Sequence, residues 1–371
     1  MPYHRIIAKF GTSLLTSGTD HLDVHIMAGL VEQVAKLQQQ GFEIILVSSG
    51  AIAAGRQKLK EVRERRKSTL FKQVLASVGQ SHLMHTYEQL FSQHGMVVAQ
   101  ALLTKADISD RAGYINARNT LLTLIELGVI CIINENDVVA IDEIEELKFG
   151  DNDNLSAMVA NLVDADLLVL LTDVGGLYTA DPHHDTDARL IPRVEEIDGQ
   201  VERLAGDTIN HHGTGGMATK IEAAKLATSS GVNVIIADGR GPDILMRIGG
   251  GGNVGTIFPA RVNKMESRKR WMLSGLACKG RVTVDKGAVG AVKEQNKSLL
   301  PAGVIQVEGE FDRGDIVDIL DENGIHLGCG ISNYSSVDLA TIKGKHSDSI
   351  PSLLGYDYGD EVIHRNNMVI V

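Results

Sequence analysis

The sequence contains few of the residues that mark a disulfide-bonded or zinc-binding protein. Its 371 residues include three widely spaced cysteines, Cys131, Cys278 and Cys329, and no Cys-x-x-Cys pair. This pattern argues against a disulfide framework and against a cysteine zinc site, and we expect buried thiols. No apolar run approaches the roughly 18 to 20 residues that a membrane helix needs, and the first residues lack the apolar segment of a signal peptide. We therefore expect a cytoplasmic protein without a membrane segment.

The sequence also lacks the single-segment phosphate loop Gly-x-x-x-x-Gly-Lys-Ser/Thr. Two glycine-rich segments are present instead, and each carries one lysine: Lys9-Phe10-Gly11-Thr12-Ser13 and Gly213-Thr214-Gly215-Gly216-Met217-Ala218-Thr219-Lys220. Backbone N–H groups at a helix N-terminus attract anions, and a nearby lysine adds positive charge. We predict that the two segments hold a nucleoside triphosphate from two sides.

The first two-thirds of the chain alternates short apolar runs with helical patterns. Runs that are apolar on both faces and are separated by helices predict an open, mostly parallel α/β sheet that is sandwiched by helices. A helix is expected around residues 25–40, and the predicted strands are residues 5–8, 43–47, 129–133, 167–171 and 232–236. Ligands of such sheets lie beyond the carboxyl ends of the strands.

A length of 371 residues favours two domains, and the composition changes near Gly249-Gly250-Gly251-Gly252-Asn253. We predict a first domain over 1–258, a linker over 259–275 and a small β-rich domain over 276–371. Strands are expected in the last domain at 280–285, 304–307, 315–320 and 368–371. Residues 276–371 carry 9 lysines and arginines against 14 aspartates and glutamates. This net negative charge disfavours nucleic-acid binding.

Combined in this order, the glycine-rich segments and the polar residues that follow the strands resemble the glutamate 5-kinase family, a branch of the amino-acid kinases. The resemblance runs essentially end to end, and the C-terminal region resembles a PUA domain. Besides the two lysine segments, the motifs that carry it are residues 48–55 (Ser48 to Gly55), Ser77-Val78-Gly79-Gln80, Asn134-Glu135-Asn136-Asp137, Phe149 to Ala157, and Thr172-Asp173 leading to Pro182.

The resemblance implies ATP-dependent phosphorylation of the γ-carboxylate of L-glutamate, the first step of proline biosynthesis, with ATP and Mg²⁺ required. It implies catalytic roles for Lys9, Lys220 and Asp153, with the carboxylate of Asp153 orienting the two lysines. The implied glutamate-binding residues are Ser49, Gly50, Asn134, Asp137 and Asn152. The implied ATP-binding residues are Lys9, Gly11, Thr172, Asp173, Thr214, Gly215, Gly216, Met217, Ala218, Thr219 and Lys220. The ligands of the metal ion stay open.

Three alternatives stay open. The substrate could be a related carboxylate, such as N-acetylglutamate or aspartate. The C-terminal domain could bind RNA, although its net negative charge disfavours this, or it could have a structural or regulatory role. By family, we expect a homo-oligomer (dimer or tetramer), feedback binding of proline and functional coupling to glutamyl phosphate reductase. We interpret the basic run Arg63 to Lys67 as a solvated surface, and adjacent histidines such as His211-His212 seldom form a metal site because their side chains usually point apart.

Overall fold

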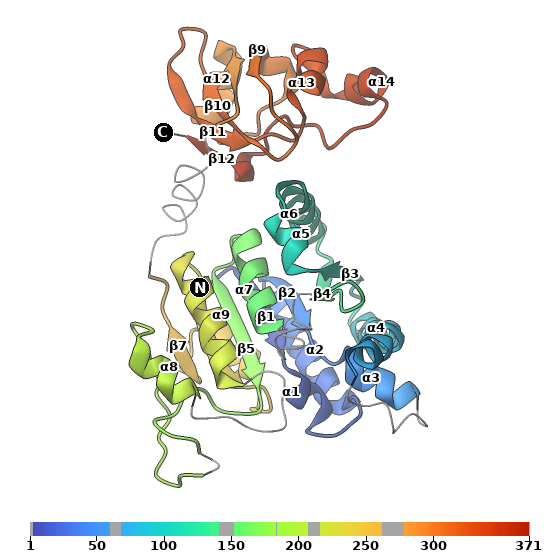
Figure 1. Ribbon diagram of the computed structural model, residues 1–371, viewed down its shortest axis with the longest axis vertical. Helices are drawn as coiled ribbons and strands as arrows, with labels where there is room; N and C mark the ends of the chain where they lie inside the picture. Colours follow the sequence, from blue (N-terminus) through green and yellow to red (C-terminus); the bar gives the residue numbers. More distant parts are fainter. Residues whose placement is uncertain are drawn as a thin grey trace. The chain divides into compact units, whose positions relative to one another are not determined.

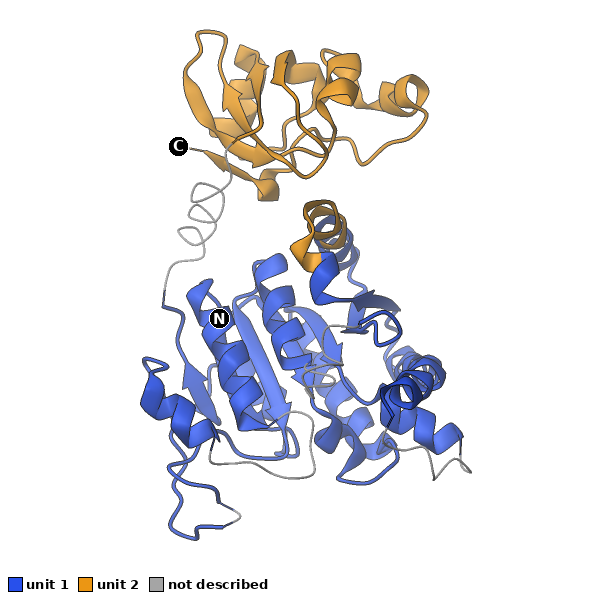
Figure 2. Ribbon diagram, in the orientation of Figure 1, with its two compact units in different colours: residues 1–107, 118–264 blue, residues 108–117, 265–371 orange. Residues whose placement is uncertain are grey.

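The computed structural model describes residues 3–59, 68–140, 152–182, 184–206, 216–261 and 278–370. Thr214, Gly215, the His211-His212 pair and the basic run at 63–67 lie outside these ranges. The chain divides into two compact units, shown in different colours in Figure 2. Unit 1 comprises residues 1–107 and 118–264, and unit 2 comprises residues 108–117 and 265–371.

Unit 1 is built on a seven-stranded sheet with the order β3-β4-β2-β1-β5-β6-β7. Every neighbouring pair is parallel except β6 and β7, which run antiparallel. The strands are β1 (Arg5–Phe10), β2 (Glu43–Ser48), β3 (Val98–Leu103), β4 (Ile130–Glu135), β5 (Leu167–Thr172), β6 (Asn233–Asp238) and β7 (Thr256–Phe258). The predicted open, mostly parallel α/β sheet is confirmed.

The five strands predicted in this region all form, each within one or two residues of the expected ends. The sequence pattern missed β3 and β7. β3 is an edge strand whose residues are all at least partly exposed, and it includes Gln100, so it lacks a continuous apolar run. β7 has only three residues, too few to show any periodicity.

Helices cover both faces of this sheet (Figure 1). Ile6, Ala8 and Phe10 of β1 point into a core that α1, α2, α3, α4 and α10 complete. Side chains alternate along a strand, so Lys9 points to the opposite face, where α7 packs on β1, β5 and α9. The helices are α1 (Thr12–Thr16), α2 (Val24–Gln39), α3 (Ala51–Lys58), α4 (Thr69–Ser92), α5 (Lys105–Ser109), α6 (Arg111–Glu126), α7 (Asn152–Leu162), α8 (Gly199–Gly206), α9 (Met217–Ser229) and α10 (Ile244–Gly249).

Two glycines allow α3 and α4 to pack with their backbones in contact. A Cβ atom on Gly79 would lie 1.8 Å from the carbonyl oxygen of Ala51, and one on Gly55 would lie 2.0 Å from that of Leu75. Because real Cβ atoms do not approach carbonyl oxygens so closely, any larger residue would force the helices apart. This contact brings one face of α4 close to the carboxyl ends of β2 and β4.

Unit 2 contains a five-stranded sheet with the order β12-β11-β10-β8-β9. Its helices and strands are β8 (Gly280–Val284), α12 (Lys286–Lys293), η1 (Pro301–Gly303), β9 (Val304–Gly309), β10 (Ile316–Leu320), β11 (His326–Ile331), α13 (Ser336–Ile342), η2 (Ser347–Ser349), α14 (Ile350–Leu354), η3 (Arg365–Asn367) and β12 (Met368–Ile370). The expected β-rich C-terminal region is confirmed, and β11 is the strand that the sequence pattern missed. β11 contains Gly328 and Gly330, and glycine is depleted in strands, so the residues of β11 form no clear strand pattern.

The cysteines are only partly as expected. Cys131 in β4 and Cys329 in β11 are buried, but Cys278 is exposed, so the prediction of three buried thiols is wrong for that residue. Cys278 lies two residues before β8, outside the strand. Among the described helices, none combines the length and the apolar character required to cross a bilayer.

Candidate active site

Three charged side chains meet beyond the ends of the central strands of unit 1. Asp153, in the first turn of α7, is fully buried, and its Oδ1 lies 2.5 Å from Nζ of Lys9 on β1. Its Oδ2 lies 3.3 Å from Nζ of Lys220 on α9 and accepts a hydrogen bond of 2.9 Å from Oγ1 of Thr219. Lys9 is 5% exposed and Lys220 is 4% exposed. The two lysine segments, far apart in the sequence, therefore converge on one carboxylate.

The two lysines decide the charge of Asp153. Burial by itself would raise the pKa of this carboxyl group, because burial disfavours the charged form. The positive charges of Lys9 and Lys220, together with hydrogen bonds from Lys9 and Thr219, outweigh burial and lower the pKa to about 2. Asp153 is thus ionised at neutral pH and holds two ammonium groups at fixed positions.

A network of amide and hydroxyl groups lies next to this trio. Nδ2 of Asn152, the residue before Asp153, donates to Oγ of Ser49 at 3.0 Å and to Oδ1 of Asn134 at 2.9 Å. Ser49 follows β2 and Asn134 lies near the end of β4. Because these two strands are parallel neighbours, their carboxyl ends, and with them these two residues, lie side by side. Gly50 has φ +102°, a left-handed conformation that suits glycine, and it precedes the N-terminus of α3.

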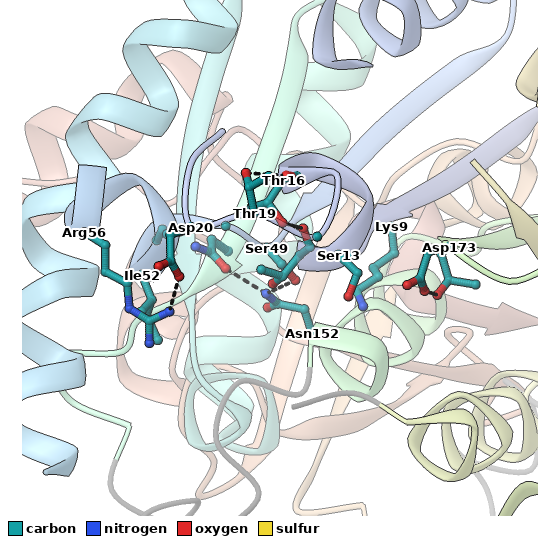
Figure 3. Close-up of a pocket in the computed structure, with 18 of the residues that line it drawn as sticks. Lys9, Ser13, Thr16, Thr19, Asp20, Ser49, Ile52, Arg56, Asn152 and Asp173 are labelled. Atoms are coloured by element: carbon teal, nitrogen blue, oxygen red, sulfur yellow. Dashed lines mark hydrogen bonds and ion pairs between the residues drawn. The ribbon is translucent and has the colours of Figure 1, made fainter. Parts of the chain in front are cut away.

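These residues line a single cavity of about 590 Å³. Figure 3 shows Lys9 and Asp173 at one end, Ser49 and Asn152 in the middle, and Asp20 with Arg56 at the other end. Predicted site residues that line the cavity are Lys9, Gly11, Ser49, Gly50, Asn134, Asp137, Asn152, Thr172, Asp173 and Lys220. A volume of this size is within the range of small-molecule binding sites.

Other predicted residues lie near the cavity without lining it. Gly216 precedes α9, and Met217 and Ala218 form its first turn, but none of the three is among the cavity residues. Thr219 reaches the site through its hydrogen bond to Asp153. In the ranges that the structure covers, no three His, Cys, Asp or Glu side chains are grouped so as to hold a metal ion.

Comparison with known proteins agrees with this geometry. Residues 4–238 match the amino acid kinase family, and residues 280–354 match the PUA domain. The chain belongs to the amino acid kinase family. It is 60% identical to the glutamate 5-kinase of Dehalococcoides mccartyi (strain ATCC BAA-2266 / KCTC 15142 / 195) over 369 residues, which cover 100% of this chain and 99% of that protein.

Two further amino acid kinases extend the comparison. The chain is 51% identical to the glutamate 5-kinase of Herpetosiphon aurantiacus, with 98% of both chains covered. It is 50% identical to the glutamate 5-kinase of Shewanella sediminis, with 100% of this chain and 98% of that protein covered. Among solved structures, the UMP kinase from Bacillus anthracis matches with a TM-score of 0.48 and 16% identity, over 71% of this chain and 98% of that one.

Sequence reasoning missed several residues of the site of this amino acid kinase. Thr16, Asp20, Arg56 and Lys72 line the cavity, and Nη1 of Arg56 lies 3.4 Å from Oδ1 of Asp20. Asp20 lies between α1 and α2, and Lys72 lies in the first turn of α4. Neither residue directly follows a strand, so the rule that ligands lie beyond strand ends gave no signal for them. Gln80 belongs to a motif that was noticed, but the sequence suggested no role for it.

Proposed function

We propose that this protein transfers the γ-phosphoryl group of ATP to the γ-carboxylate of L-glutamate and forms L-glutamyl 5-phosphate, the first step of proline biosynthesis. The observation that carries this proposal is the convergence of Lys9 and Lys220 on Asp153, at one side of a cavity that also contains Ser49 and Asn152. High identity to glutamate 5-kinases over the whole chain supports the same substrate.

The chemistry needs positioning and positive charge more than it needs a base. A carboxyl group like that of glutamate has a reference pKa of about 4.3, so the nucleophile is already ionised at neutral pH. During transfer, negative charge develops on the equatorial oxygens of the phosphoryl group and on the leaving oxygen. Lys9 and Lys220 supply two ammonium groups there, and preorganised donors of this kind each contribute about 3 to 4 kcal/mol. Asp153 orients both lysines through its two ion pairs.

Glutamate must be held by its α-ammonium and α-carboxylate groups, so that only the γ-carboxylate meets the phosphate. Asp137, which follows β4 and lines the cavity, has the charge to bind the α-ammonium group, and the amide of Asn152 assists. Ser49, together with the backbone N–H groups after Gly50 at the start of α3, suits a carboxylate. This assignment requires an unmodified ammonium group on the substrate.

The nucleotide occupies the end of the cavity formed by Gly11, Thr172 and Asp173, and its phosphates lie against the segment that ends at Lys220. Thr214 and Gly215 complete that segment in this proposal. Mg²⁺ bound with ATP supplies further positive charge to the phosphates. The side-chain oxygens of Thr172 and Asp173, which line this end of the cavity, are of the kind that would hold a hard cation.

The test is an assay of acyl phosphate, trapped as hydroxamate, with purified protein, ATP and Mg²⁺. We expect product with glutamate and little with N-acetylglutamate or aspartate. N-acetylation removes the charge that Asp137 recognises, and aspartate is one methylene too short to reach the phosphate. Absence of hydroxamate with glutamate would refute the proposal, and a preference for N-acetylglutamate would refute the role of Asp137.

Several expectations rest on the family alone and belong to the same proposal. They are a homo-oligomeric state (dimer or tetramer), feedback inhibition by proline, coupling to glutamyl phosphate reductase and a cytoplasmic location. Sedimentation of the purified protein tests the first, and the hydroxamate assay with added proline tests the second. A monomer that is insensitive to proline would remove both without affecting the assignment of the reaction.

A further inference from the structure

One face of α4 is tied to the loop that follows β4. Gln73 and Gln80 are seven residues apart, which is close to two helical turns, so both side chains lie on the same face of the helix. Nε2 of Gln73 donates to the backbone oxygen of Asp137 at 3.1 Å. Oε1 of Gln80 accepts a hydrogen bond of 2.8 Å from Nδ2 of Asn134. The two glutamines thus hold both ends of the segment 134–137.

Asn134 links Gln80 to Asn152 in the cavity wall through hydrogen bonds. Oδ1 of Asn134 accepts hydrogen bonds from the backbone N–H of Glu135 at 2.9 Å and from Nδ2 of Asn152 at 2.9 Å. Because Gln80 binds the amino end of the Asn134 side chain, both ends of this amide are engaged and its orientation is fixed. That orientation presents an oxygen to Asn152, and it thereby determines which end of the Asn152 amide remains for a ligand.

Among the residues that the structure describes, this chain of hydrogen bonds ends in an acceptor without a donor. Oδ1 of Asn152 is buried and has no hydrogen-bond partner within those residues, and Asn152 lines the cavity at 5% exposure. A buried acceptor without a donor is costly, and a ligand that brings an N–H group removes this cost. The α-ammonium group of an amino acid is such a donor, and an acceptor at this position discriminates against ligands without it.

We propose that Gln80 is a positioning residue for recognition of the substrate ammonium group, acting through Asn134 and Asn152, and that Gln73 acts in the same way through Asp137. The close contact at Gly79 makes this possible, because it brings α4 to the ends of β2 and β4. The inference rests on the proposed function. It adds that the selectivity for an amino acid over a plain dicarboxylate depends on Gln73 and Gln80 of α4, which lie outside the cavity lining.

The experiment compares glutamate with glutarate, which has the same two carboxylates but no ammonium group. In the full-length protein we expect Gln80→Met to raise KM for glutamate about tenfold, which corresponds to one buried hydrogen bond. The inhibition constant of glutarate should change less than twofold, and KM for ATP should not change. Gln80→Glu retains an acceptor for Nδ2 of Asn134, so it should restore much of the selectivity.

Gln33→Met is the matched control. Gln33 is a buried glutamine on α2 whose Oε1 accepts a hydrogen bond of 2.9 Å from the backbone N–H of Leu245. Its replacement should lower the melting temperature and leave the constants for both ligands unchanged. If Gln80→Met does not fold, Gln73→Met provides the same comparison through Asp137.

Two results would overturn the inference: equal weakening of glutamate and glutarate, which indicates general damage to the cavity, or no change for either ligand. Both are distinct from failure of the proposed function. That failure would be visible in the unaltered protein, as absence of acyl phosphate from glutamate.

Discussion

Replacement of Asp153 by asparagine is the sharpest test of the charged trio. The substitution keeps the shape of the side chain but removes the charge that neutralises two buried ammonium groups. Burial raises the pKa of Asp153, but the charges of Lys9 and Lys220 and the hydrogen bonds from Lys9 and Thr219 outweigh it. The net effect lowers the pKa from 3.8 to about 2, a difference that corresponds to about 2 to 3 kcal/mol of stability. A loss of this size should lower the melting temperature of unit 1 by roughly 5 to 10 °C.

The pH dependence of this loss follows from the direction of the pKa shift. Since the pKa of Asp153 is lower in the folded chain than in the unfolded chain, its contribution is fully present above about pH 4. The contribution is lost as the pH falls through about 2, where the folded form also takes up the proton. The difference in unfolding free energy between the unaltered protein and Asp153→Asn should therefore be constant from pH 7 to pH 5 and should narrow below pH 4.

The assay is denaturant unfolding, monitored for unit 1 at several pH values, together with hydroxamate formation at pH 7. Asp20→Asn is the matched control, because Asp20 also lines the cavity and pairs with a cation, but its side chain is 56% exposed. It should change the unfolding free energy by less than about 1 kcal/mol. Equal stability of Asp153→Asn and the unaltered protein at pH 7 would show that the trio is not held together as described.

Three further predictions use other parts of unit 1. Lys220→Ala should reduce the rate of hydroxamate formation about 10²- to 10³-fold. Lys225→Ala, on the same helix but 59% exposed, should leave this rate unchanged. If Lys220→Ala has the same rate as the unaltered protein, the role of Lys220 is contradicted. Gly79→Ala should lower the unfolding free energy by about 1 to 3 kcal/mol because its Cβ would meet a carbonyl oxygen. A Cβ atom added at Gly29 would have no atom within 4 Å beyond its chain neighbours and the backbone of its own helix, so Gly29→Ala should leave the unfolding free energy unchanged or raise it in the same denaturant measurement. Asp137→Asn should raise KM for glutamate about tenfold or more, and an unchanged KM in the hydroxamate assay would exclude its contact with the ammonium group.

The sequence allowed the sheet of unit 1 to be predicted because its central strands are apolar on both faces. Such runs are read directly from the chain, and the polar residues immediately after them mark the ligand edge. Ser49, Asn134 and Thr172 were found in this way. β3 and β7 were not predicted, because an edge strand or a three-residue strand has no such pattern.

The hydrogen bonds that α4 makes to the site could not be predicted in the same manner. Gln80 reaches Asn134 only because Gly79 lets α4 pack closely against α3, and this approach depends on the crossing of two helices. A single sequence gives helix faces but not the distance between helices. The prediction that Asp153 pairs with Lys9 had a different basis, because it came from the resemblance to a family and not from periodicity.

The position of β1 in the middle of its sheet affects how the protein is made. β1 is the first strand to leave the ribosome, and it pairs with β2 on one side and with β5, residues 167–172, on the other. At a synthesis rate of about 5 to 20 residues per second, β5 emerges on the order of 10 s or more after β1. During that interval, one edge of an apolar strand has no neighbour in the nascent chain. Fragments that stop before β5 therefore expose this edge and are prone to aggregate.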